Sequence, residues 1–527
     1  MPTYAAPGVY VEEVPSSQKV LTAAATAIAA FVGFTGSAPD DDPNDPDGVK
    51  PRLVTSWTQF ENLYGGYAEG CMLPIAVRGY FDNGGTIAYI VRIPNTSPSG
   101  QPSQLGLPAA DKALGTALEI TSVEPDAKIS VVVENADPGS DGSDGDGPSP
   151  FTISVVEGGQ TVESFENLTV TPGDQNAEKV VNATSTKVKV KVNIDPKLDM
   201  SSLIDVMKPG TYPLVPEPAT PVPVNGRKFA GSESARTGIN GLAIAEDVTM
   251  VIVPDLVTAA TKPDKTVDLN LWKAVQTSMI THCELHGNRM AVLDAPPDMS
   301  PQQIKEWRSD VAMYDSAFAA FYYPWIKVEN PMATNGADAE MFIPPSGHIA
   351  GVWARVDETR GVWKAPANET IAGCLDVEYP VTKAEQSLLN PIGINCIRPF
   401  GTRGIRIWGG RTLASDTDWR YLNVRRLFNM VETTILDGTQ WAVFEPNDVK
   451  LWEGVKRTLA GFLTGLWREG ALFGTSADQA FYVKCDAETN PPQSIDEGKL
   501  VVEVGIAPVK PAEFVIFRIS QQKQTAS

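Results

Sequence analysis

The chain has 527 residues, which is more than one hydrophobic core usually organises, so we expect roughly two to four domains or a core with large insertions. Hydrophobic residues make up 42% and charged residues 20% of the sequence, a composition that excludes a fibrous repeat and wholesale disorder. The formal net charge of -21 repels phosphate backbones and anionic lipid, which argues against nucleic acid as a direct partner.

The 5 cysteines are widely scattered and form no CxxC pair, so they indicate reduced thiols and neither a zinc site nor a redox couple. No run approaches the roughly 20 apolar residues of a membrane span, and residues 1–10 lack a basic segment followed by a long apolar one. We therefore expect no membrane anchor, no signal peptide, no metal and no cofactor.

The N-terminal part reads as an extended arm that leads into a core. Residues 7–15 (PGVYVEEVP) form a short extended segment between two prolines, and residues 31–34 (FVGF) follow a run of small residues as a buried strand would. Residues 57–64 (WTQFENLY) have the spacing of an amphipathic helix that stops at a glycine pair. The β-branched and aromatic content of residues 86–93 (TIAYIVRI) predicts a strand.

Residues 94–239 have a different sequence pattern, with short strand candidates at 128–133, 152–156 and 187–192. We expect an inserted all-β domain here. The acidic run 137–150 (DPGSDGSDGDGPSP) cannot bury apolar area and should form a loop. Its alternate aspartates are typical of calcium loops, but no helix flanks the run and no glutamate stands at its end, so a solvated acidic loop is the better interpretation.

From residue 246 onward strands and helices alternate. The apolar run 248–253 (VTMVIV) suits a strand buried on both faces, and residues 271–286 carry one apolar helical stripe that ends at a glycine. Residues 289–293 predict the next strand, and a helix over 304–311 and a strand over 318–326 follow. The fold class is therefore α/β (mixed α+β), with a βαβ-type core and a mainly parallel sheet.

Several residues imitate catalytic motifs. His282 and His286 surround a glutamate in the order H-C-E-L-H, which is not the H-E-x-x-H of a zinc peptidase, so we expect them to interact with the terminal carbonyls of their helix. Asp255, His286 and Ser346 occur in the order of one serine-protease triad, and Ser476 lies in a Gly-Thr-Ser segment. Order alone is weak support, because no glycine-framed turn surrounds Ser346.

An arginine-rich stretch follows the core. Residues 401–410 (GTRGIRIWGG) lack the Lys-Ser/Thr ending of a phosphate loop and alternate as a strand between turns does. A local basic cluster in an acidic chain suits head-to-tail association of identical subunits. The arginines of this cluster are Arg398, Arg403, Arg411, Arg420, Arg425 and Arg426.

Motifs near both ends of the chain occur together and in order. They are PGVYVEEV (7–14), FVGFTG (31–36), NGGTIAYIVRI (83–93), LNPIGINCIRPFGTRGIRIWGG at the start of 389–435, AFYVKCD (480–486) and GKLVVEVGIAPVKPAEFVIFRI (498–519). This set closely resembles the tail sheath proteins of contractile phages and of bacterial contractile injection systems. The resemblance covers roughly the first 95 residues and everything after about residue 240, and it leaves the insert unmatched.

The resemblance implies a structural subunit, not an enzyme, that polymerises helically around an inner tube and contracts to drive the tube through a target envelope. It implies a core of subtilisin-like topology without protease activity. Its partners would be further copies of itself, the inner tube protein, and baseplate and terminal cap proteins. It would assemble in the bacterial cytoplasm into a phage tail or an injection particle that can be released outside the cell.

Both ends of the chain predict strands without a local partner. Residues 514–517 (FVIF) are apolar on both faces and precede only a polar tail, so an unpaired edge there would aggregate. By resemblance to sheaths, such arms are donated to sheets of neighbouring subunits. The residues of these inter-subunit arms are Val9, Tyr10, Val11, Val14, Phe514, Val515, Ile516, Phe517 and Ile519.

The strongest helical pattern spans residues 447–469, with Asn447 as the expected N-cap. Its apolar stripe contains Trp452, Val455, Leu459, Phe462 and Leu466. The opposite face is charged and is a solvated surface by pattern alone. By resemblance to other sheaths it would face the tube, with Lys456 and Arg457 as candidate contacts.

These features give the following expected domains: 1–22 N-terminal extended arm, 23–93 first part of the core, 94–239 outward-facing β-rich insert, 240–388 α/β core, 389–505 C-terminal α+β assembly domain and 506–527 C-terminal strand arm. Two alternative functions stay open. One is a degenerate or specialised serine hydrolase on the α/β core, and the other is a surface-binding module that acts through the β insert.

Overall fold

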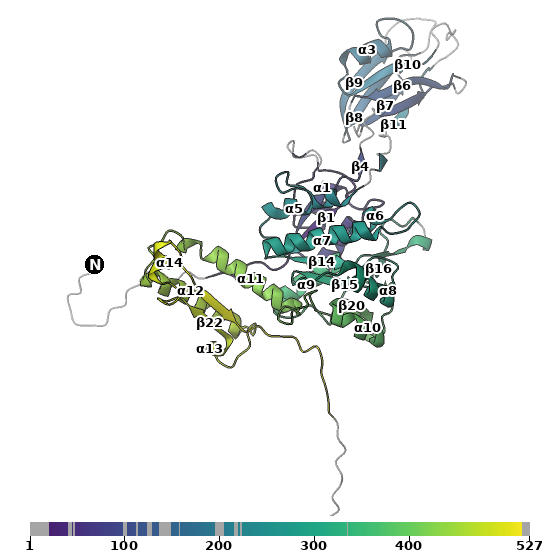
Figure 1. Cartoon of the computed structure of the whole chain (residues 1–527). Helices are drawn as coiled ribbons and strands as arrows, with labels where there is room; N and C mark the ends of the chain where they lie inside the picture. The colour runs from purple at the N-terminus through teal and green to yellow at the C-terminus, as the bar shows by residue number, and fades with distance from the viewer. Residues whose placement is uncertain are drawn as a thin grey trace, which may run out of the picture. The chain divides into compact units, whose positions relative to one another are not determined.

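The computed structural model describes residues 21–39, 45, 48–97, 103–111, 114–123, 129–135, 149–157, 159–194, 205–214, 220–221, 224–334 and 336–518. The chain divides into two compact units (Figure 1). Unit 1 comprises Met1–Pro94 and Val224–Ser527, and unit 2 comprises Asn95–Pro223. Most of the acidic run 137–150 lies outside the described residues.

A 9-stranded sheet forms the centre of unit 1, in the order β18-β21-β20-β15-β14-β13-β1-β3-β2. The strands from β20 to β3 pair in parallel, as expected from the alternation of strands and helices, and antiparallel strands flank them on both sides. The strands are β1 (Ile28–Gly33), β2 (Arg52–Val54), β3 (Ile87–Arg92), β13 (Met250–Ile252), β14 (Met290–Asp294), β15 (Ala319–Tyr323), β18 (Glu369–Thr370), β20 (Ile394–Pro399) and β21 (Ile405–Ile407).

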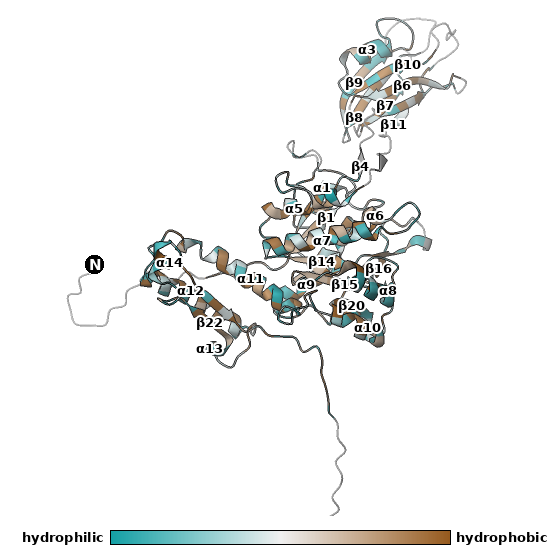
Figure 2. Cartoon of the chain, viewed as in Figure 1, coloured by the Kyte–Doolittle hydropathy of each residue, from teal (hydrophilic) through white to brown (hydrophobic). Residues whose placement is uncertain are grey.

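The central strands are buried on both faces, because helices cover each side of the sheet. In β1, Ala30 and Val32 join one hydrophobic cluster, whereas Ala29 and Phe31 join the other. The first cluster packs against α6 (Leu256–Ala260), α7 (Leu269–His286) and α8 (Pro301–Glu306); the second packs against α1 (Trp57–Tyr64), α2 (Leu73–Asp82) and α9 (Ser346–Arg360). Hydrophobic residues follow the strands of this sheet, and the covering helices show mixed colours (Figure 2).

Glycines end two of the covering helices as predicted. Ser56 caps α1 and accepts a hydrogen bond from the Gln59 amide, and Gly65 ends the helix in the left-handed conformation. Gly287, with φ 72°, ends α7 in the same way. The helix expected over 304–311 begins earlier, as α8, and continues through Trp307–Ala312 as a π-helix.

The C-terminal part of unit 1 contains two long helices and a small sheet. The helices are α11 (Leu422–Gly438) and α12 (Val449–Arg468), followed by α13 (Ala477–Ala480) and α14 (Pro492–Asp496). β22 (Phe481–Lys484) pairs antiparallel with β23 (Glu503–Ile506). Two further hydrophobic clusters fill this part of the chain.

Short elements connect the larger ones in unit 1. They are α4 (Gly226–Ala230), α5 (Gly238–Gly241), α10 (Lys383–Leu389), β16 (Ile326–Glu329), β17 (Glu340–Ile343), β19 (Asp376–Val377) and the short helices Leu242–Ile244, Gly336–Asp338, Asn390–Ile392, Gly401–Arg403 and Gln440–Ala442. Among the helices that the structure describes, none has the length and apolar character needed to cross a membrane.

Unit 2 contains two sheets around its own core. The sheets have the orders β10-β6-β5 and β11-β7-β8-β9. Their strands are β5 (Gln104–Pro108), β6 (Thr116–Ser122), β7 (Ile129–Asn135), β8 (Phe151–Glu157), β9 (Gln160–Leu168), β10 (Val188–Val192) and β11 (Gly210–Leu214), and β4 (Thr96–Ser97) pairs with β12 (Thr220–Pro221). The expectation of an all-β insert is wrong in one respect, because α3 (Ala177–Thr184) buries Ala177 and Val181 in this core.

Candidate assembly site

The C-terminal segment of the chain is attached to the rest of unit 1 as far as Glu513. Beyond β23, the amide of Val509 donates to the carbonyl of Ala471 at 3.2 Å, and the amide of Phe473 donates to the carbonyl of Ala507 at 2.8 Å. The Glu513 carboxylate then accepts from Arg411 Nε at 2.9 Å and from Arg411 Nη2 at 2.5 Å. The side chains of Arg411 and Glu513 are only 11% and 19% exposed, so this ion pair is largely shielded from water.

The apolar residues directly after Glu513 are exposed. Phe514, Val515, Ile516 and Phe517 are 72%, 69%, 79% and 83% exposed and belong to no strand within this chain. Four large apolar side chains in water are a liability that natural proteins cover. The other predicted arm residues, Val9, Tyr10, Val11, Val14 and Ile519, lie outside the described residues.

The sheet of β22 and β23 offers open edges. In the part of the chain that the structure describes, these two strands form a sheet of their own, so each strand has an outer edge without a strand neighbour. Tyr482 on β22 is 58% exposed. An open edge of this kind can accept a further extended segment through backbone hydrogen bonds.

Helix α12 has the predicted apolar stripe with two differences. Asp448, not Asn447, is its N-cap and accepts from the Leu451 amide, while Asn447 Oδ1 accepts from the indole of Trp452 at 2.7 Å. The fully buried residues are Leu451, Trp452, Val455, Leu459, Leu463 and Leu466, and Phe462 is half-buried.

Lys456 and Arg457 lie outside this stripe. Arg457 is exposed, and Lys456 lies 3.5 Å from Glu453 in a pair whose side chains are 42% and 56% exposed. Both cations are therefore accessible in the free chain.

The arginine cluster that suited head-to-tail association lies only partly at the surface. Arg425 and Arg426 are buried. Arg426 Nη1 donates to Asp357 Oδ1 at 2.9 Å, and the guanidinium of Arg425 lies 4.2 Å from the ring centre of Trp419. Since most of these cations are satisfied within the chain, the expectation of a head-to-tail basic surface is wrong for Arg425 and Arg426.

The residues that resemble a serine-protease triad in sequence order do not lie together in the structure. Ser346 is buried, and its Oγ donates to Asp294 Oδ2 at 2.5 Å. Asp255 is buried elsewhere and accepts from the backbone amides of Phe34 and Leu73 at 2.7 and 3.1 Å. Burial raises the pKa of both carboxyls to about 7. Each aspartate thus ties a loop or a helix N-terminus to the end of a strand.

The histidine pair on α7 also has a structural environment. His282 Nε2 lies 3.1 Å from Arg289 Nη1, so the ring accepts a hydrogen bond from the guanidinium, and burial lowers its pKa to about 3. The expectation that His282 interacts with helix-terminal carbonyls is therefore wrong. Among the described residues no group of histidine, cysteine and carboxylate side chains could hold a metal ion.

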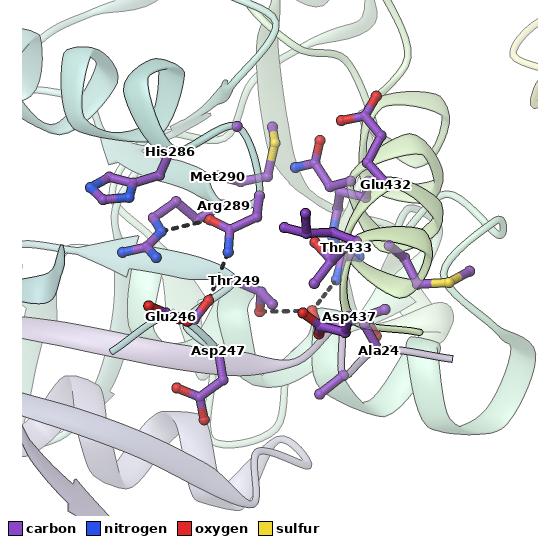
Figure 3. Close-up of a pocket in the computed structure, with 18 of the residues that line it drawn as sticks. Ala24, Glu246, Asp247, Thr249, His286, Arg289, Met290, Glu432, Thr433 and Asp437 are labelled. Atoms are coloured by element: carbon purple, nitrogen blue, oxygen red, sulfur yellow. Dashed lines mark hydrogen bonds between the residues drawn. The ribbon is translucent and has the colours of Figure 1, made fainter. Parts of the chain in front are cut away.

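A groove of about 910 Å³ lies between the residues just before β13, the start of β14 and the side of α11. Figure 3 shows Thr249 and Met290 on the strand side, Thr433 and Asp437 on the helix side, and Ala24 beside them. The groove therefore marks the place where the N-terminal segment runs between the core and α11.

A small sheet with open edges and an exposed apolar segment beyond the last anchored residue are features of a chain that binds other chains. Two family models match the chain: the phage tail sheath protein central domain over residues 240–413 and the phage tail sheath C-terminal domain over residues 414–522. Together they cover more than half of the sequence, and the chain belongs to the phage tail sheath family.

Curated relatives match over part of the chain. The tail sheath protein of Vibrio phage KVP40 is 29% identical over 182 residues, which are 34% of this chain and 26% of the relative. A putative prophage major tail sheath protein of Pseudomonas aeruginosa is 30% identical over 198 residues, which are 36% of this chain and 48% of the relative. The chain thus spans about half or less of the length of these curated relatives.

Solved structures match over nearly the whole chain. The PVC sheath complex of an extracellular contractile injection system, in its contracted state, has 25% identity and a TM-score of 0.56 and covers 99% of both chains. The helical sheath of the anti-feeding prophage, also contracted, has 24% identity and a TM-score of 0.58, with 99% of this chain and 100% of that chain covered. At 24% identity, the likeness to the anti-feeding prophage sheath shows a similar fold alone.

Sequence reasoning missed the partners of the C-terminal segment. Glu513 was visible only as part of a motif, and its ion pair with Arg411 joins residues 102 positions apart. The arginine-rich stretch indicated that carboxylate partners such as Glu513 should exist. It did not indicate which arginines are buried and which are exposed.

Proposed function

We propose that this chain is the sheath subunit of a contractile tail or injection particle, which polymerises helically around an inner tube and contracts to drive the tube through a target envelope. The observation that carries the proposal is the exposed apolar segment 514–517, directly after the anchored Glu513, in a chain of the sheath family. A monomer gains nothing from four apolar side chains in water, whereas an assembly buries them.

The assembly contact would be strand exchange between copies. Residues 514–517 of one copy, and residues 9–14, would each add a strand to an open edge of the β22–β23 sheet in a neighbour. Each backbone hydrogen bond formed in this way contributes about 0.5–1.5 kcal/mol net. Because the link is made of backbone bonds, it can persist while the subunits change their relative positions.

Further partners follow from the same function. Lys456 and Arg457 on α12 would contact the inner tube through weak, releasable ionic interactions, which suits a tube that must slide during contraction. Baseplate and terminal cap proteins would bind the ends of the helix; the chain's fold also resembles a chain in the baseplate of the anti-feeding prophage, at 24% identity and a TM-score of 0.55. Assembly would take place in the bacterial cytoplasm.

Each domain would have a separate role in the sheath. The α/β core would contain the parallel sheet in a subtilisin-like topology, and the C-terminal part of unit 1 would form the assembly domain. Unit 2 (Asn95–Pro223), which is shorter than the insert expected over 94–239, would face outward. The role is structural and not catalytic, because Ser346 is buried against Asp294 and no histidine bonds to it among the described residues. Ser476, the other candidate nucleophile, is exposed at the start of α13 and bonds to no histidine in that part of the chain either.

The test is deletion of residues 1–20, which removes one proposed donor strand and none of the described residues. We expect the truncated chain to stay folded by circular dichroism and to form no cylinders by negative-stain electron microscopy. The matched control deletes the acidic run 137–150, whose composition offers little apolar area to bury, and should still form cylinders. Normal cylinders from the chain that lacks residues 1–20 would refute strand exchange by this arm.

A further inference from the structure

Both ends of the described chain are attached to the same helix, α11. On the N-terminal side, the amide of Ala24 donates to Thr434 Oγ1 at 2.9 Å, and the carbonyl of Thr26 accepts from Arg426 Nη2 at 3.0 Å. Thr434 and Arg426 are both residues of α11, and Figure 3 shows Ala24 beside this helix. The N-terminal segment is thus bound at two points before it leaves the described structure.

On the C-terminal side, the first turn of α11 holds the last anchored residues. Asn423 Nδ2 donates to the carbonyl of Val509 at 3.0 Å. The hydroxyl of Tyr421, the residue before α11, lies 3.5 Å from Glu513 Oε2, and Asn390 Nδ2 donates to Glu513 Oε1 at 2.7 Å. Together with the two bonds from Arg411, these contacts surround the Glu513 carboxylate with donors.

The Glu513 contacts are linked to α11 through the backbone as well. The amide of Leu422 donates to the carbonyl of Gly410 at 3.0 Å, and the amide of Thr412 donates to the carbonyl of Arg420 at 2.9 Å. Arg411 therefore lies on a segment that is bonded to the start of the helix on both sides. Burial favours the neutral form of Glu513, but the bonds from Arg411 and Asn390 outweigh it and lower the pKa of the carboxyl.

We propose that α11 is a tie between the two terminal arms: its polar anchors fix the separation of the points at which the arms leave the subunit. An α-helix is stiff over this length, and the 11 positions from Asn423 to Thr434 correspond to about 16 Å along its axis. The proposal rests on the proposed function, in which the arms pair with neighbouring copies. It adds that each subunit presents the bases of its two arms at a set spacing and not as independent flexible tails.

Glu513 is the residue that distinguishes a set spacing from a loose one. It is the last residue with side-chain bonds to the core before the exposed residues 514–517. If its carboxylate no longer pairs with Arg411, the free length of the arm extends back toward Val509, and the point of exit becomes mobile.

The experiment measures the distance between nitroxide labels on T22C and V515C in the free full-length subunit by pulsed electron paramagnetic resonance. Thr22 and Val515 are exposed, and C374S removes the one native cysteine among the five that is not buried. We expect a narrow distance distribution, and E513Q should broaden it roughly twofold, because a neutral amide keeps the shape but loses the charge-assisted pair. T434V, which removes the acceptor for the Ala24 amide, should broaden the same distribution from the other end.

The matched control is E497Q. Glu497 pairs with Lys499 at 2.6 Å, but both side chains are about half exposed, so the same substitution there should leave the distribution unchanged. An unchanged distribution in E513Q, or an equally broad one in the parent chain, would overturn the tie. Because this measurement uses the free subunit, its outcome is independent of whether deletion of residues 1–20 abolishes cylinders, which tests the proposed function.

Discussion

Arg426 forms a buried ion pair whose loss should be costly. The side chains of Arg426 and Asp357 are 3% and 4% exposed. The carboxylate of Asp357 also accepts from Thr26 Oγ1 at 2.7 Å, and the guanidinium lies 4.7 Å from the ring centre of Trp353. Burial raises the pKa of Asp357 and Arg426 opposes that shift, so the arginine favours the ionised form of this carboxyl.

The substitution R426M keeps an unbranched side chain, although a shorter one, and removes its charge. Asp357 then keeps only the hydroxyl of Thr26 as a partner, and leaving one member of a buried pair without the other costs about 3–5 kcal/mol. Against a total unfolding free energy of about 5–15 kcal/mol for a folded domain, that is at least about a fifth of the stability. The double variant R426M/D357L removes both charges and should cost less than R426M alone, because no isolated charge remains.

The assay is equilibrium unfolding of the free subunit in urea, followed by tryptophan fluorescence and circular dichroism. The matched control is R78M. Arg78 also pairs with an aspartate, Asp82 at 2.9 Å, and also lies over a tryptophan ring, but the two side chains are 44% and 48% exposed. Its loss should change the unfolding free energy by no more than about 1 kcal/mol. An R426M variant within about 1 kcal/mol of the parent would refute the reasoning.

Three further predictions concern other parts of unit 1. Burial raises the pKa of Asp294 to about 7, above its usual value near 4. Its contribution to the unfolding free energy should therefore be present below pH 4 and fall by up to about 4 kcal/mol as the pH rises to 7. D294N should flatten this fall in unfolding experiments across that range, and a parent chain that gains stability through this group as the pH rises would contradict the prediction. The charge reversals K456E and R457E should leave the subunit folded and weaken its co-sedimentation with the cognate tube, whereas salt-insensitive, unchanged co-assembly would show that this face of α12 is only solvated. G287A should lower the free energy of unfolding by about 1 kcal/mol. Gly287 has φ +72° and no atom lies near the position of an added Cβ, so only backbone strain opposes a side chain there. An unchanged melting temperature would argue against that strain.

Local patterns in the sequence were sufficient for most of the elements. The strand predicted over 86–93 is β3, the helix over 57–64 is α1, and the apolar stripe of residues 271–286 is the buried side of α7. The family was predicted from sequence motifs, and those from residue 389 onward lie within the matched family models. These predictions succeeded because periodicity, capping residues and turn residues act over a few positions, where the chain's order alone decides which side chains meet.

Tertiary structure alone decided which polar residues are buried and with whom. Arg426 and Asp357 are 69 positions apart, and Glu513 and Arg411 are 102 apart, so no local pattern separates these buried pairs from exposed charges. His282 differs in that its partner Arg289 is only 7 positions away, beyond the end of α7, and the packing at the helix end brings the two side chains together. Burial depends on how helices and sheet pack across the whole unit, and a charge is stable inside only where that packing supplies its partner.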